Sequence, residues 1–202
     1  MQLGAAVNQA DNECWTALHS ASEKGHLDRQ RLLDASLSAL ARDFPQFRAG
    51  WFSRFHEAMA PTITERLQRV NAYIGLLGSA IPPTAVLALD ALIIVDKESP
   101  MPADRVLPHL APLMLAKAKG TAKKAALWVQ TISKREPTCA SQAFDLMLKS
   151  LLHEATEIQE LALRWIESKA ASLTSLQREE LEVAQGEAES EDLVSDPERL
   201  ER

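Results

Sequence analysis

Half of the aromatic side chains of this protein lie in one short stretch, where they alternate with arginines. A helix over this stretch would place Phe47, Trp51 and Phe55 on one face, one turn apart. Trp and Arg are among the side chains most enriched where proteins bind one another, and His56 is the best candidate here for a residue with a functional role. The candidate partner-binding residues are therefore Arg48, Trp51, Arg54 and His56. The alternative is that the same aromatics form a core that joins the N-terminal helices to the rest of the chain.

A second candidate site is cationic. Between Asp104 and Glu136 the sequence has no acidic residue but seven basic ones. Lys123 and Lys124 would lie in the first turn of a predicted helix, where free N–H groups and the helix dipole favour an anion. The predicted anion or nucleic-acid site comprises Lys117, Lys119, Lys123, Lys124 and Arg135. A phosphate backbone, an acidic partner or the chain's own acidic end could occupy it, and a solvated lysine-rich loop is the alternative.

Motifs of known enzyme chemistry are not found in the sequence. It contains no glycine-rich phosphate loop, no nucleophile elbow and no HExxH zinc motif. Cys14, His19 and His26 fit no familiar zinc spacing, so we expect no metal and no cofactor. Glu154, Glu157 and Glu160 open a predicted helix, where the dipole alone explains acidic side chains.

Composition restricts the class of protein. The chain has 202 residues, of which 46% are hydrophobic, and this excludes a mostly disordered chain. No apolar run approaches the roughly 18 to 20 residues of a membrane span, and the first residues do not resemble a secretory signal. Two cysteines do not make a disulfide framework, so we expect a cytoplasmic protein. The net charge is −6, and ten acids against two bases between Glu179 and Arg202 predict an acidic mobile end.

Helical periodicity dominates the elements that would position these residues. Apolar side chains recur at three- and four-residue spacing, as in Ile158, Leu161, Ala162 and Trp165, and no segment alternates with a period of two. Thr62 with Glu65 predicts a capping box at a helix start. The predicted helices span residues 13–24, 28–43, 46–59, 62–80, 84–97, 103–118, 121–135, 138–152, 156–171 and 173–185.

Three of these helices align with one another. They share an Ala-Leu pair at Ala88, Ala126 and Ala162, at steps of 38 and 36 residues. Helix pairs that recur at this interval are typical of α-solenoids, in which each pair covers its neighbour.

The segment HEATEIQELAL, which begins at His153, resembles the second-helix start of HEAT-type repeats. The segments LLDASLSALARDFPQFRAGWFSRFHEAMAPT, IPPTAVLAL and AKAKGTAKKAAL also resemble a bacterial family of large HEAT-like helical proteins, over roughly residues 28–170. The resemblance implies a helical scaffold with no known activity, and a chain shorter than its relatives. TALHSA followed by GHLD, from Thr16, is similar to one ankyrin unit, but the next 33 residues do not repeat it, so two ordinary helices are preferred there.

We therefore expect an all-α chain, an α-solenoid of stacked antiparallel helical hairpins. Its expected parts are an aromatic-rich helical cap over residues 1–81, HEAT-like repeats over 82–181 and the acidic end over 182–202. The expected function is that of a non-enzymatic scaffold that binds a protein partner, because solenoids expose long grooves. Nucleic-acid binding through the basic residues of 105–135 is the alternative, and an enzyme of unknown chemistry comes third. The sequence leaves the partner and the oligomeric state open.

Overall fold

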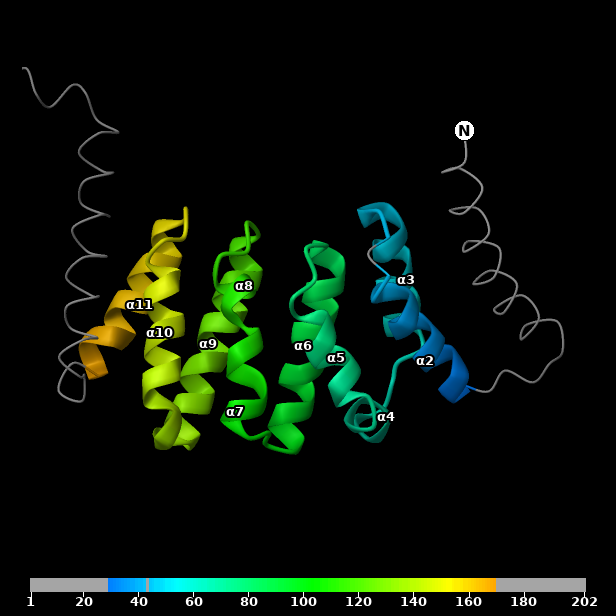
Figure 1. The fold of residues 1–202 in the computed structure, drawn as a ribbon, viewed down its shortest axis with the longest axis horizontal. Coiled ribbons are helices and arrows are strands. Elements are labelled where there is room, and N and C mark those ends of the chain that lie inside the picture. The colour runs from blue at the N-terminus through cyan, green and yellow to red at the C-terminus, as the bar shows by residue number, and fades with distance from the viewer. Residues whose placement is uncertain (1–28, 43, 170–202) are drawn as a thin grey trace, which may run out of the picture. The chain divides into compact units, whose positions relative to one another are not determined.

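Every element in the described part of the chain is helical. The computed structural model describes residues 29–42 and 44–169, and within these ranges there is no strand (Figure 1). The prediction of an all-α fold is confirmed for these residues. The predicted helices at 13–24 and 173–185, and the predicted acidic end, lie outside the described residues. The described chain divides into two compact units between Ser99 and Pro100.

In the described part of the first unit, five helices form two packed layers. α2 packs on α3, to which it is joined by a short connection. Both α4 and α5 pack on α6. Between the layers α2 contacts α5 and α3 contacts α6. The helices are α2 (Arg29–Leu40), α3 (Gln46–Ala58), α4 (Ile63–Leu67), α5 (Val70–Leu76) and α6 (Pro82–Glu98). As its all-round apolar sequence predicts, α6 is deeply buried along much of its length.

The second unit repeats this scheme. α8 packs on α9 and α10 packs on α11, while α8 also contacts α10 and α9 also contacts α11. First helices therefore lie against first helices, and second against second. The elements are α7 (Ala103–Val106), η1 (Leu107–His109), α8 (Ala111–Met114), α9 (Lys119–Arg135), η2 (Pro137–Cys139), α10 (Ala140–Ser150) and α11 (Thr156–Lys169).

Two predicted helices are broken, and each break has a physical cause. The predicted helix 103–118 is divided into α7, η1 and α8, because Pro108 and Pro112 have no N–H to donate and their rings crowd the preceding turn. The predicted helix 62–80 is divided into α4 and α5 at Arg69. The guanidinium of Arg69 donates to the Glu65 carbonyl at 3.0 Å, and the Arg69 backbone N–H bonds to Arg66 instead. The side chain thus takes the acceptor that a continuous helix would use.

Other local predictions agree with the structure. Thr62 and Glu65 form the capping box that opens α4, with both reciprocal hydrogen bonds present. The remaining described helices begin and end within three residues of their predicted bounds.

Four helices begin at more even intervals than the Ala-Leu alignment predicts. The second helix of each layer begins at Gln46, Pro82, Lys119 and Thr156, at successive intervals of 36, 37 and 37 residues. Ala88, Ala126 and Ala162 are all completely buried at helix contacts. Their leucine neighbours differ, because Leu89 is buried whereas Leu127 is 45% exposed. The shared feature is therefore one small buried residue, and not the Ala-Leu pair.

This packing gives a direct test. We expect Ala126→Leu to lower the free energy of unfolding by about 1–3 kcal/mol, because a larger side chain has no room where α9 meets its neighbours. Leu127→Ala, at the adjacent exposed position, is the matched control and should change stability by only about 0.5 kcal/mol. Urea denaturation followed by circular dichroism measures both. Equal effects for the two variants would contradict the assigned faces of α9.

Candidate functional site

The two faces of α3 differ sharply in character. Its inner face is buried in the first unit and carries Ala49, Gly50, Phe52, Ser53 and His56. Its outer face carries Phe47, Trp51, Arg54 and Ala58 at spacings of four, three and four residues, and all four are exposed. We call these four residues the α3 stripe. This spacing is that of a helix face that packs on another helix.

Aromatic contacts hold the stripe in a defined form. The Trp51 ring stacks on Phe55 with ring centroids 5.2 Å apart, and it meets Phe52 edge-on at 5.0 Å. Arg48 lies beside the stripe, with its guanidinium 5.2 Å from the Phe44 ring centroid. Phe47 is 86% exposed and Trp51 is 41% exposed. Trp51 therefore presents apolar surface to solvent from a ring that its neighbours already hold in one orientation. Because the ring is already ordered, less conformational entropy would be lost when a partner binds.

His56, which the sequence analysis placed with the partner-binding residues, does not lie on this surface. It is completely buried, with Nδ1 2.7 Å from the Ser36 hydroxyl and Nε2 2.7 Å from the Tyr73 hydroxyl. Ser36 donates its own proton to the Leu33 carbonyl, so Ser36 accepts from His56 Nδ1–H and Tyr73 donates to Nε2. The imidazole thus bridges α2 and α5 through α3. Residues of the exposed face and of the buried face alternate within the short sequence of α3. Their spacing alone did not show which face would be buried.

The surroundings of His56 keep it neutral. Burial, followed by the positive charges of Arg66 and Arg69, lowers the pKa of His56 to about 4. Burial also raises the pKa of Tyr73 to about 12, so that its hydroxyl keeps the proton it donates. Because Ser36, His56 and Tyr73 are all sealed from solvent, this hydrogen-bonded chain has no access to a substrate and supports the fold.

A charged network beside His56 was not predicted from the sequence. Arg29 Nε donates to Glu65 at 2.7 Å, and Arg69 Nε donates to Asp34 at 2.7 Å. Gln30 joins the two pairs by bonding to both Glu65 and Arg69. The hydrogen bond from Arg29, with that from the Thr62 backbone, holds the pKa of Glu65 at about 2. Only the capping box at Thr62 signalled that Glu65 had a structural role.

The predicted anion site is partly filled by the protein itself. Lys123 bonds to the Glu157 carboxylate, and Lys119 Nζ lies 3.7 Å from the same carboxylate. These contacts, that from Lys123 foremost, lower the pKa of Glu157. Glu157 lies in the first turn of α11, where a negative charge interacts favourably with the helix dipole. The same carboxylate also pairs with Lys119 and Lys123 of α9.

The other predicted basic residues are dispersed. Lys117 lies in the loop after α8, and Lys124 is on α9, both exposed. Arg135, at the far end of α9, donates to the Met101 carbonyl at 2.7 Å and so ties α9 to the start of its own unit. The structure therefore brings Lys119 and Lys123 together, whereas Arg135 lies 12 residues away along the helix.

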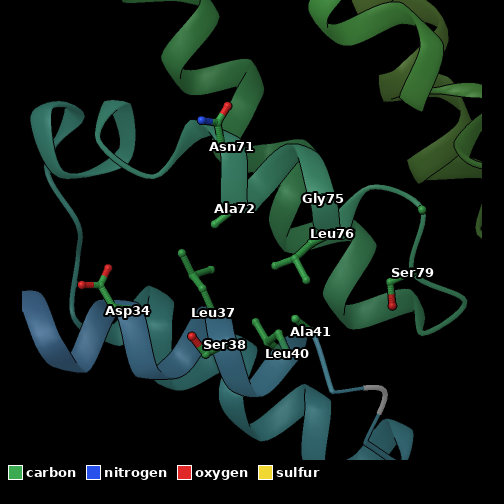
Figure 2. A pocket seen from close by; sticks show the side chains of 11 residues that line it. Asp34, Leu37, Ser38, Leu40, Ala41, Asn71, Ala72, Gly75, Leu76 and Ser79 are labelled. Atoms are coloured by element: carbon green, nitrogen blue, oxygen red, sulfur yellow. The ribbon is translucent and has the colours of Figure 1, made fainter.

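A groove that the sequence analysis missed runs between α2 and α5 (Figure 2). It has a volume of about 720 Å³, and Leu37, Leu40 and Leu76 lie between the two helices. Asp34 is at one end, where Arg69 already pairs with it, and Ser79 is at the other. Glycines at 75 and 78 are the only signal for it in the sequence, because they leave the α5 side without bulk. The lining holds no acid–base pair for catalysis.

His56 generates a pH dependence with a definite sign. Its folded pKa lies below the ordinary value of 6.5, so its contribution to stability is full above pH 6.5 and is lost as pH falls towards 4. We expect this loss to reach about 3 kcal/mol at pH 4. His56→Gln should be less stable than the parent at pH 7 but should lack this part of the slope between pH 6.5 and 4.5. Urea unfolding at stepped pH values measures it, and an unchanged slope would contradict a buried neutral imidazole.

Comparison with known proteins identifies a family without assigning chemistry. No helix in the described ranges combines the length and the apolar character needed to cross a bilayer. Neither the curated proteins nor the solved structures include a match to this chain. The family model described as Domain of unknown function (DUF6493) matches residues 5–120, which is more than half of the sequence. The protein therefore belongs to the DUF6493 domain family.

Proposed function

We propose that this chain is a non-enzymatic helical-repeat scaffold that binds a partner protein through the α3 stripe. The observation that carries the proposal is the 86% exposure of Phe47 on the same helix face as Trp51. A large aromatic side chain held in water on a well-packed helix costs free energy that a partner would recover. Trp51 and Arg54 add the side-chain types that dominate binding energy at interfaces.

The packing within each unit supports the scaffold part of the proposal. In both units second helices lie against second helices, and these helices begin at nearly constant intervals. Stacked hairpins of this kind form α-solenoids such as HEAT repeats, which present long faces to partners.

The side chains of the α3 stripe indicate what kind of partner surface would fit it. Phe47, Trp51 and Ala58 offer an apolar strip, with a small residue at one end that allows close approach. Arg54 lies within the strip and Arg48 lies beside it. The matching surface is an amphipathic helix with apolar anchors and at least one acidic side chain.

Substitution of the most exposed residue tests the proposal. We expect Phe47→Ala to weaken partner binding by about tenfold or more, as for an interface hot spot, while stability changes by only about 0.5 kcal/mol. Affinity capture with quantitative mass spectrometry identifies partners whose recovery depends on Phe47, and calorimetric titration with the purified partner then gives the affinity.

Ile94→Ala is the matched control, because Ile94 is an exposed apolar residue on α6 of the same unit. It should leave binding unchanged. Recovery of every partner at the same level from Phe47→Ala, Ile94→Ala and the parent would refute the α3 stripe as the binding surface.

Nucleic-acid binding is the second candidate, and the exposed lysines of α9 favour it. The Lys119 side chain is 70% exposed, although Glu157 offsets its charge. If a phosphate backbone binds there, it must compete with Glu157, so removal of that carboxylate should help binding.

We therefore expect Glu157→Gln to raise affinity for a mixed-sequence DNA duplex at low salt, and Lys123→Glu with Lys124→Glu to lower it. Glu160→Gln is the matched control, since Glu160 pairs with Arg164 on α11 and not with α9. Fluorescence anisotropy at increasing salt measures the affinities. An absence of binding at low salt for all variants would exclude this candidate.

A further inference from the structure

Two turns at one end of the second unit carry exposed apolar side chains. Leu115 directly follows α8 and is 47% exposed, and Leu152 lies just beyond α10 and is 59% exposed. Both turns lie at the same end of these helices (Figure 1). A leucine held in water costs free energy that an apolar ligand would recover.

A buried histidine joins the two turns. The Nε2–H of His153 donates to the Ala116 carbonyl at 3.0 Å, and its Nδ1 accepts from the Ala155 N–H at 2.9 Å. Ala116 directly follows one of the two leucines in the chain and His153 follows the other, so this contact places the turns side by side. His153 is 4% exposed, so the link lies inside the unit while the leucines lie on its surface.

A turn at this point of the repeat does not need a large apolar residue. The turn between α5 and α6 of the first unit leads into a second helix, as does the turn after α8. It carries Gly78, Ser79 and Ala80, which are all small. The exposed leucines of the second unit are therefore not a requirement of the turn, and this favours a role at the surface.

Lysines surround the same two turns. Lys117 and Lys119 lie between α8 and the first turn of α9, and both are exposed. The segments 115–124 and 152–157 together hold four lysines and two glutamates. An excess of two positive charges therefore remains, even though Glu157 pairs with lysines of α9.

A ligand that fits these turns must combine negative charge with an apolar interior. A nucleic acid would explain the lysines, but it would leave the leucines in water. The surface of a bilayer with anionic phospholipids supplies both properties, because its headgroups attract lysines and its acyl region accepts apolar side chains. Leucines on two adjacent turns can enter such a surface together without a pocket that matches their shape.

We propose that the second unit attaches to anionic phospholipid surfaces through Leu115, Lys117, Lys119 and Leu152, which we call the turn pair. The two leucines enter the acyl region, and the two lysines contact the headgroup phosphates and carboxylates. The attachment uses no residue of the α3 stripe, so it is independent of the proposed partner binding.

Flotation of the full chain with lipid vesicles tests the apolar part of the proposal. We expect binding to vesicles of equimolar phosphatidylcholine and phosphatidylserine. Leu115→Ser with Leu152→Ser should lower the partition coefficient by about tenfold or more, because neither side chain then enters the acyl region. Leu127→Ser is the matched control, since Leu127 is 45% exposed but lies more than two helical turns into α9, and it should leave binding unchanged.

The charge of the turn pair is tested in the same assay. Binding should be weaker to vesicles of phosphatidylcholine alone, and it should fall as salt is added. Lys117→Glu should lower affinity for the anionic vesicles by about fivefold or more. Lys134→Glu makes the same change of charge at an exposed position near the other end of α9, and it should have a smaller effect.

A conservative substitution separates a bilayer from a shaped protein pocket. Leu115→Phe with Leu152→Phe should keep vesicle binding, because an acyl region accepts any apolar side chain. Thermal unfolding followed by circular dichroism checks that each variant folds as the parent does. If the double serine variant is less stable, Leu152→Ser alone is compared with Leu127→Ser.

Three results would overturn the proposal. The first is a parent chain that floats with neither kind of vesicle. The second is equal binding of the parent, the leucine variants and Leu127→Ser. The third is a loss of affinity for a DNA duplex in Lys117→Glu without any binding of the parent to vesicles, because these lysines would then contact nucleic acid and the leucines would have no part in it.

Discussion

The hydrogen-bonded bridge from Ser36 through His56 to Tyr73 determines the arrangement of the first unit. It joins α2, α3 and α5 with two bonds of 2.7 Å inside the core of the unit. A buried imidazole without both partners would cost several kcal/mol, so α3 is held in one rotation about its axis. That rotation places Phe52 inside and Phe47 outside. The exposed stripe is thus a consequence of a polar contact on the opposite side of the same helix.

Several basic side chains in each unit pair with acids from neighbouring elements. Arg29 and Arg69 of the first unit find Glu65 and Asp34, and Lys119 and Lys123 of the second find Glu157. The number of lysines in a sequence segment therefore overstates the net positive charge that a bound ligand would experience. Exposed pairs of this kind add little stability, but they reduce the charge available to a phosphate backbone.

The packing of the helices explains which side chains are left on the outer faces of each unit. In each unit a small residue such as Ala88 or Ala126 lets second helices approach closely. The interior is then filled by leucines, and the exposed side chains lie on outer faces. Membership of the DUF6493 family identifies the domain to which the chain belongs, and the α3 stripe is an exposed feature of its first unit.

Local sequence patterns predicted the helical fold class, most of the helix ends and the capping box at Thr62, because these depend on contacts within a few residues. It also located the aromatic stretch from which the stripe is built. Only the folded chain shows that His56 is a core residue, that Arg69 pairs with Asp34 of α2, and that Glu157 pairs with the lysines of α9. Each of those outcomes depends on a partner more than 15 residues away in the chain, and local periodicity carries no information about such pairs.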